Sequence, residues 1–268
     1  MDWLIGAAGA AAVAGAAYWK ESLSKSGAIA ALVMGTIYYG AGNMLWFGIL
    51  LLFFITSTLL SRFRSARKAD LEKSYAKTGR RDAGQVLANG GIGMLLCLIH
   101  YWSPGEVWIW LFIGVMAAVT ADTWATEVGS LSRKPPRSIL SGKVLPAGTS
   151  GGVSWLGSAA AALGGLIIGL GAYAFAAVAG MAPHLAAYSL AGLAGGLVGA
   201  FTDSYLGATV QLMYRCQVCG KEVEVPNHCG AATVRARGWS AMNNDAVNMI
   251  SSLLGGAAAW AVGLLIAG

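Results

Sequence analysis

The sequence predicts an all-α, polytopic membrane protein in which residues 1–268 form a single integral-membrane domain. Two observations indicate this fold class. Hydrophobic residues make up 56% of the 268 residues and charged residues only 11%, whereas a soluble domain carries about 25% charged residues. The 38 glycines lie largely in Ala/Gly tracts, which let helix backbones approach closely in lipid. We therefore expect about eight membrane-spanning helices and little mass outside the bilayer.

A helix needs about 20 apolar residues to cross the hydrocarbon core of a bilayer, and by that measure we identify eight segments. In chain order they are 2–19, 27–42, 44–61, 84–102, 106–129, 151–178, 184–210 and 241–267. The boundary between the second and third is weak, because only Gly40, Gly42 and Asn43 mark it. The first segment lacks the basic region of a signal peptide, so we interpret it as a retained helix.

The Lys and Arg residues predict the orientation of the chain. All 18 of them lie in four connecting segments, which are 20–26, 62–83, 130–150 and 211–240. The positive-inside rule places such segments in the cytoplasm, so we expect both termini outside. Basic residues confined to loops beside apolar helices indicate how the chain is oriented in the membrane, and they do not indicate a nucleic-acid partner.

The segment AAVTADTWATEVG, residues 117–129, carries two carboxylates in an otherwise apolar helix, Asp122 and Glu127. An ionisable side chain inside a membrane helix is energetically costly and indicates a functional site. The later segment VGAFTDSYLGATVQ repeats the pattern, with Asp203 in the place of Asp122, and this indicates an internal repeat of the fifth and seventh helices. A single buried acid bonded to a neighbouring helix is the simpler alternative, and two related copies count against it.

Glu127 lies five positions after Asp122, which is about 140° around a straight helix. The two carboxylates reach one ion only if the helix opens, so we expect it to unwind near residues 124–129. If the helix is straight instead, Glu127 points away from the ion that Asp122 would bind, and it is the first residue to remove from the candidate metal ligands.

A magnesium site is expected where these acids meet the start of the last helix. The motif MNNDAVNMISS supplies Asn244, Asp245 and Asn248, and oxygen ligands from carboxylates and amides suit Mg²⁺. Four carboxylates are the candidate ligands of the ion, and the first three are also the candidate catalytic residues: Asp122, Glu127, Asp203 and Asp245.

The stretch GKVLPAGTSGGVS, residues 142–154, covers the end of the 130–150 segment and leads into the sixth helix, and it is a candidate phosphate-binding loop. Glycines let backbone N–H groups approach an anion, and the helix that follows adds a favourable dipole. Gly/Ser-rich loops are also common turns, but this one lies beside the acidic helix. The groups that we expect to contact phosphate are Lys143, Gly148, Thr149, Ser150 and Gly151.

The 62–83 segment is the most highly charged part of the chain. We expect most of it to be a solvated amphipathic helix that contacts anionic lipid. Its end differs, because Arg80 and Arg81 lead toward the amide of Asn89 in the fourth helix. Arginine binds phosphate in a bidentate way, so these three residues are candidates for a second phosphate group.

The 211–240 segment contains Cys216, Cys219, His228 and Cys229 in the pattern C-x₂-C-x₈-H-C. This is a four-ligand set suited to a tetrahedral structural zinc ion. A disulfide is disfavoured in a reducing cytosol. Adjacent His228 and Cys229 are awkward joint ligands, which leaves open whether all four bind one ion.

Five motifs, taken together, resemble the integral-membrane family of plant phytyl-phosphate kinase and transmembrane protein 19. They are GRRDAGQVLANGG, ADTWATEVG, PAGTSGGVS, TDSYLGATVQ and NNDAVN, and they extend over nearly the whole chain. The resemblance implies that an isoprenoid monophosphate is phosphorylated to the diphosphate by a nucleoside triphosphate. It also implies functional roles for Arg80, Arg81, Asp82, Asn89, Asp122, Glu127, Thr149, Asp203, Asn244 and Asn248.

The spacing is also similar to that of dolichol and phytol kinases and of phosphatidate cytidylyltransferases, which makes CTP the favoured donor. The Cys/His segment resembles a feature of prokaryotic members and so implies a prokaryotic plasma membrane. We therefore expect a membrane kinase that uses Mg²⁺ and transfers a phosphoryl group to a prenyl monophosphate on the cytoplasmic side. The alternatives are a CTP-dependent lipid cytidylyltransferase and a transporter, which also tolerates buried acids and repeats. A homodimer is left open.

Overall fold

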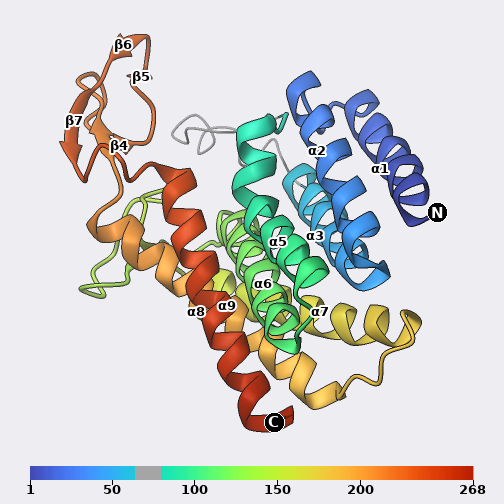
Figure 1. Ribbon diagram of the computed structural model, residues 1–268. Helices are drawn as coiled ribbons and strands as arrows, with labels where there is room; N and C mark the ends of the chain where they lie inside the picture. The colour runs from blue at the N-terminus through green and yellow to red at the C-terminus, as the bar shows by residue number, and fades with distance from the viewer. Residues whose placement is uncertain (64–79, 268) are drawn as a thin grey trace.

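The computed structural model describes residues 1–63 and 80–267 and consists mainly of long helices (Figure 1). The amphipathic helix expected in the 62–83 segment falls largely on residues 64–79, which lie outside the described residues. The all-α polytopic fold is confirmed. The helices are α1 (Asp2–Trp19), α2 (Lys25–Ile37), the π-helical turn η1 (Tyr38–Gly42), α3 (Met44–Arg62), α5 (Ala83–Trp102), α6 (Glu106–Gly129), α7 (Trp155–Val178), α8 (Leu185–Thr209) and α9 (Asn244–Ala267).

Helices occur at all eight predicted segments, and within the described residues six of them are long and apolar enough to cross a membrane. These six are α3, α5, α6, α7, α8 and α9. The helix α2 has only 13 residues before η1 begins, which is short for a crossing. The number of eight membrane crossings therefore stays a prediction.

Polar side chains set where several helices begin. The Asp82 carboxylate and the Gln85 side chain form a capping box at the start of α5. Ser154 accepts a hydrogen bond from the Gly157 N–H, so α7 begins at Trp155 rather than at residue 151. Side chains that accept from free N–H groups are the usual helix start signals.

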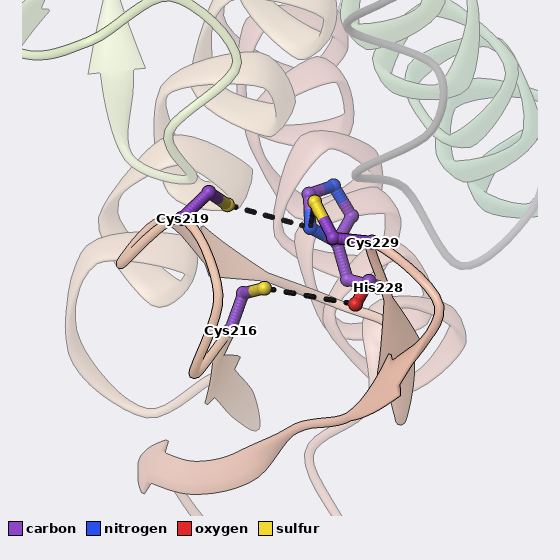
Figure 2. A group of neighbouring side chains, drawn as sticks. All are labelled: Cys216, Cys219, His228 and Cys229. Carbon is purple, nitrogen blue, oxygen red and sulfur yellow. Dashed lines mark hydrogen bonds between the residues drawn. The ribbon is translucent and has the colours of Figure 1, made fainter.

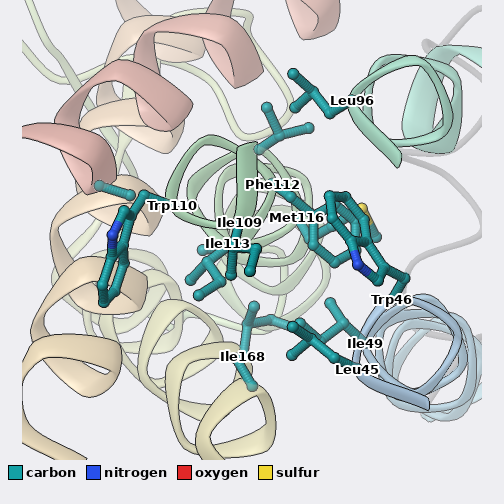
Figure 3. Packing of buried hydrophobic residues seen from close by; sticks show 14 of the residues in the cluster. Leu45, Trp46, Ile49, Leu96, Ile109, Trp110, Phe112, Ile113, Met116 and Ile168 are labelled. Carbon is teal, nitrogen blue, oxygen red and sulfur yellow. The ribbon is translucent and has the colours of Figure 1, made fainter. Parts of the chain in front are cut away.

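The helix α6 is the centre of the bundle, and its residues from Phe112 to Ala121 are buried without interruption. Figure 3 shows Phe112 and Met116 packed with Trp46 of α3 on one side of α6, while Trp110 points to the other side. The ring centroids of Trp46 and Phe112 are 4.3 Å apart. Large apolar side chains thus fill the space between α6 and the N-terminal helices.

The opposite side of α6 packs on α8 and α9 through small residues. A Cβ atom added to Gly195 of α8 would lie 2.7 Å from Gly114 Cα of α6, and one added to Gly199 would lie 2.8 Å from Ala118 Cα. Gly255 of α9 lies against both helices. Backbones this close leave room for no larger residue. The internal repeat of α6 and α8 itself stays a prediction.

Short strands occur only in the loops at one end of the bundle, as far as the described residues show. The pair β1 (Arg137–Ser138) and β2 (Gly152–Val153) is antiparallel. Between α8 and α9, a sheet of order β4-β3-β7 and the pair β5-β6 project beyond the start of α9 (Figure 1). Their bounds are β3 (Met213–Arg215), β4 (Glu222–Val223), β5 (Asn227–His228), β6 (Ala231–Ala232) and β7 (Val234–Arg237).

Candidate functional site

A cavity of about 810 Å³ lies where α6 and α8 end and where α7 and α9 begin. It brings together residues that are far apart in the sequence. The predicted site residues in its lining are Arg81, Asn89, Asp122, Glu127, Gly148, Thr149, Ser150, Gly151, Asp203, Asn244 and Asn248. A cavity with both carboxylates and groups that can bind phosphate has the composition expected of a site for a metal-bound nucleotide.

Asp122 and Asp203 meet at the α6–α8 interface. Ala118 of α6 and Gly199 of α8 are in close contact, and Asp122 and Asp203 follow them by one helical turn. Both acids therefore lie on the helix faces that form this contact. Ser251 of α9 donates a hydrogen bond of 3.4 Å to Asp203 Oδ2. The two acids are close enough for their charges to interact. Helix packing thus places two carboxylates together at the end of the bundle that carries the loops.

The expected unwinding of the helix near residues 124–129 is wrong. The helix α6 continues to Gly129, and Ser130 extends its ladder by donating its N–H to Thr126 O at 3.0 Å. Glu127 therefore lies on another side of α6 from Asp122, where its Oε1 accepts a hydrogen bond of 2.5 Å from Ser61 of α3. We remove Glu127 from the proposed metal ligands, although it lines the same cavity.

Arg81 lies on the Glu127 side of the cavity and is held by several contacts. Its Nη1 donates to Thr58 Oγ1 at 2.9 Å, and its guanidinium lies 5.6 Å from the ring centroid of Phe54. Burial lowers the pKa of Arg81 from its ordinary value, and the nearby Glu127 carboxylate acts in the opposite direction. A partly desolvated guanidinium held in a fixed position is suited to a phosphate group.

The structure does not bring Arg80, Lys143 or Asp245 into the described lining of the cavity. Arg80 forms an ion pair with Glu21 at the exposed surface. Lys143 lies in the exposed 138–144 turn, where its carbonyl accepts from the Ser138 N–H at 2.8 Å. Asp245 is in the first turn of α9, whereas its neighbour Asn244 reaches the cavity.

The candidate phosphate loop is held against the end of α8. Gly148 and Gly151 have φ values of 81° and 83°, which favour glycine. A Cβ atom on Gly151 would lie 2.7 Å from Ala208 Cα. Ser150 Oγ donates to Gln211 Oε1 at 2.6 Å. The loop is thus fixed immediately before the N-terminus of α7, which also faces the cavity through Gly157.

Sequence reasoning missed several residues of the lining, among them Gln211 and Glu224. Gln211 Nε2 donates to Glu224 Oε1 at 2.9 Å, and the charge of Glu224 interacts with those of Asp122 and Asp203. The sequence signal for Glu224 was weak, because an acid in a charged loop is ordinary. Gln211 was part of the TDSYLGATVQ motif, but its role there was not evident.

The four Cys and His residues of the 211–240 segment form a cluster that can hold a metal ion (Figure 2). Their ligand atoms all lie within 4.8 Å of one another. Hydrogen bonds from the Cys219 backbone and the His228 side chain lower the pKa of Cys216 to about 6. A readily formed thiolate is the form of cysteine that binds metal.

Comparisons with known proteins agree with a membrane protein. The family described as "Integral membrane protein DUF92" matches residues 8–256. Protein PGR of Arabidopsis thaliana is 32% identical over 88% of each chain. An uncharacterized membrane protein of Methanocaldococcus jannaschii is 30% identical over 88% of this chain and 84% of its own. The chloroplastic protein VTE6 of Arabidopsis thaliana is 23% identical over 91% of this chain and 66% of its own. No solved structure matches.

Proposed function

The chain belongs to the DUF92 family of integral membrane proteins, and from this premise we propose that it is a membrane kinase for prenyl monophosphates. The reaction transfers the γ-phosphoryl group of a nucleoside triphosphate, with CTP favoured, and yields the prenyl diphosphate. The family resemblance drawn from the five motifs is confirmed by the matches to DUF92 and to VTE6. One observation carries the proposal: a single cavity is lined by Asp122 and Asp203 together with Arg81 and the glycine-rich loop.

The residues around Asp122 and Asp203 fit Mg²⁺. Two carboxylates lie near each other, and the amides of Asn244 and Asn248 line the same cavity. Mg²⁺ prefers such oxygen ligands and usually keeps waters and substrate phosphates as its other ligands. The bound ion would neutralise charge on the nucleotide phosphates. Asp122 and Asp203 would hold it, and the two amides would orient the nucleotide.

Arg81 and the 148–151 loop would bind phosphates on either side of the transferred group. In the reaction, an oxygen of the acceptor phosphate forms a bond to the γ-phosphorus. The bond from that phosphorus to the bridging oxygen breaks, and the nucleoside diphosphate leaves with the electron pair. The acceptor phosphate is already ionised near neutral pH, so no strong general base is needed. Positioning and charge neutralisation supply most of the catalysis in such reactions.

A second, apolar pocket supports a lipid acceptor at the Arg81 end. It has a volume of about 60 Å³ and shares Arg81, Gln85 and Asn89 with the large cavity. Its other walls are apolar side chains that include Met34 and Phe53. A prenyl chain exceeds this volume, so the first isoprene unit would lie in the pocket and the remainder between helices in the bilayer.

The orientation of the site is part of the proposal. All four basic segments contribute to the cavity, through Ser22, Arg81, Gly148 and Glu224 among others. A cavity built from these segments opens on the side that the positive-inside rule assigns to the cytoplasm. Nucleotides are available there. We therefore propose a multi-pass protein of a prokaryotic plasma membrane with its active site cytoplasmic and both termini outside.

The test is an assay of the purified protein with Mg²⁺, in which phytyl, geranylgeranyl and farnesyl monophosphates are each combined with four γ-labelled nucleotides. A kinase transfers the label to the lipid, and we expect the highest activity with CTP. Release of labelled pyrophosphate with CMP left on the lipid would instead identify a cytidylyltransferase. Solute flux in proteoliposomes without nucleotide consumption would identify a transporter.

A further inference from the structure

The Cys/His cluster and Glu224 are carried by the same short hairpin. The strand β3 ends at Arg215, immediately before Cys216, and pairs with β4, which ends immediately before Glu224. The turn between them contains Cys216 and Cys219, and it is closed by the Gly220 N–H donating to Cys216 O at 3.0 Å. A ligand that fixes this turn therefore also fixes β4, the strand that precedes Glu224 in the lining of the cavity.

Two distances within the cluster match the edges of a tetrahedral metal site. The Sγ atoms of Cys219 and Cys229 lie 3.5 and 3.2 Å from His228 Nδ1. With zinc bonds of about 2.3 Å to sulfur and 2.0–2.1 Å to nitrogen, the sulfur–nitrogen edge of a tetrahedron is about 3.6 Å. The cluster needs little adjustment to surround one ion. His228 would bind it through Nδ1, because that nitrogen faces both thiols.

The backbone resolves the difficulty of two adjacent ligands. Cys229 has a φ of 54°, and the following Gly230 has a φ of 75°. This left-handed conformation is costly for cysteine, and such outliers persist where the surroundings enforce them for a function. It turns the chain sharply, so that His228 and Cys229 face the same point (Figure 2). A metal ion gives this strained conformation a physical reason.

The segment has little apolar packing of its own. Within 211–240, which the structure describes completely, the buried hydrophobic residues are Met213, Cys216 and Val223. A unit of this size cannot bury enough apolar surface to hold a fixed conformation and usually relies on a disulfide or a metal ion. Glu222 forms an exposed ion pair with Arg215 and a partly buried one with Arg237, and two such pairs do not replace an apolar core.

We propose that a zinc ion bound by Cys216, Cys219, His228 and Cys229 fixes the β3–β4 hairpin and thereby holds Glu224 in the cavity as a third carboxylate beside Asp122 and Asp203. Gln211 completes the connection, because it donates to Glu224 and accepts from Ser150 of the phosphate loop. The zinc site itself does not depend on the kinase activity. The role of Glu224 rests on the proposed function, because it assumes that the cavity binds a cation.

The test begins with the metal content of the purified full-length protein, measured by mass spectrometry, and we expect about one zinc ion per chain. Cys219→Ser should lose the zinc, and proteolysis in the 211–240 segment should become faster. Cys97→Ala is the matched control, since Cys97 is a buried cysteine of α5 outside the cluster, and it should keep the zinc. Wild-type protein that neither contains zinc nor takes it up would overturn the site.

The coupling to the cavity is measured with Mn²⁺ as a probe, by spin-resonance titration in the absence of nucleotide. Glu224→Gln should keep the zinc and bind Mn²⁺ about tenfold more weakly, and Cys219→Ser should weaken Mn²⁺ binding by a similar factor. Unchanged Mn²⁺ affinity in a zinc-free but folded Cys219→Ser protein would overturn the coupling. Both measurements are independent of kinase turnover, so the failure of the proposed function would be seen separately.

Discussion

Ser61 of α3 donates a hydrogen bond of 2.5 Å to Glu127 of α6. This contact holds Glu127 on the α3 side of the cavity, away from Asp122, the other acid in this part of α6. Asp122 faces Asp203 of α8, whereas Glu127 lies toward α3 and interacts with the charge of Arg81. The cavity thus has a carboxylate pair at the α8 side and an acid–arginine pair at the α3 side. The variants below test this division.

Asp122→Asn and Asp203→Asn should each lower kcat by about 100-fold or more while the protein stays folded. In the proposed mechanism, each substitution removes one of the carboxylate charges that would hold Mg²⁺ against the nucleotide, and charge stabilisation of this kind is usually the largest catalytic contribution. Turnover measured at saturating substrate checks this. Asp245→Asn is the control, because Asp245 does not line the cavity, and it should retain activity. Full activity in either cavity variant would rule out the metal assignment.

Glu127→Gln should leave Mn²⁺ affinity unchanged, because Glu127 lies on a different face of α6 from Asp122. The amide oxygen can still accept from Ser61, so the packing of α3 on α6 is preserved. The loss of a negative charge beside Arg81 should instead change the KM for the prenyl monophosphate several-fold. Titration and steady-state kinetics separate the two effects, and a large fall in Mn²⁺ affinity would return Glu127 to the metal ligands.

Arg81→Lys should raise the KM for the prenyl monophosphate by about tenfold or more. A lysine cannot reproduce both the bidentate geometry and the stacking on Phe54. Arg80→Ala is the neighbouring control, because Arg80 forms an exposed ion pair with Glu21, and exposed pairs contribute little. An unchanged KM in Arg81→Lys would show that positive charge alone, rather than the geometry of the guanidinium, binds the phosphate.

Gly199→Ala should destabilise the helix bundle by about 1–3 kcal/mol, the usual cost of overpacking. The new methyl group would lie 2.8 Å from Ala118 Cα, so α6 and α8 must move apart. Gly15→Ala in α1 is the control, because a Cβ atom there meets nothing within 4 Å. Thermal unfolding in detergent compares the two variants. Equal melting temperatures would show that the α6–α8 contact is not close-packed.

The helices and the two central acids could be predicted from the sequence because they stand out against their surroundings. Asp122 and Asp203 are isolated charges in apolar helices, and the segments around them repeat the same pattern. Glu127 was harder, because the sequence does not show whether a polar helix end unwinds or finds a partner such as Ser61. The structure shows the second outcome.

Glu224 could not be predicted because its position depends on tertiary structure. Its immediate neighbours in the sequence are Val223, which is buried, and Val225. Nothing in the order of these residues indicates that the Glu224 side chain reaches the cavity between the membrane helices. The sequence also could not show which of the adjacent arginines Arg80 and Arg81 lines the cavity, because the same motif contains both. The isolated bridge between Leu23 and Arg81 fixes the backbone at this point, and only Arg81 reaches the cavity.

The glycine-mediated packing of α6, α8 and α9 also limits how a lipid can reach the site. Three helices in backbone contact leave no passage for a hydrocarbon chain between them, and separating them would break the interface that positions Asp122 and Asp203. Among the described helices, the side formed by α2, α3 and α5 is joined instead by flexible side chains such as Met34 and Leu50. A membrane-dissolved acceptor would therefore enter laterally from that side and meet Arg81 before the carboxylates.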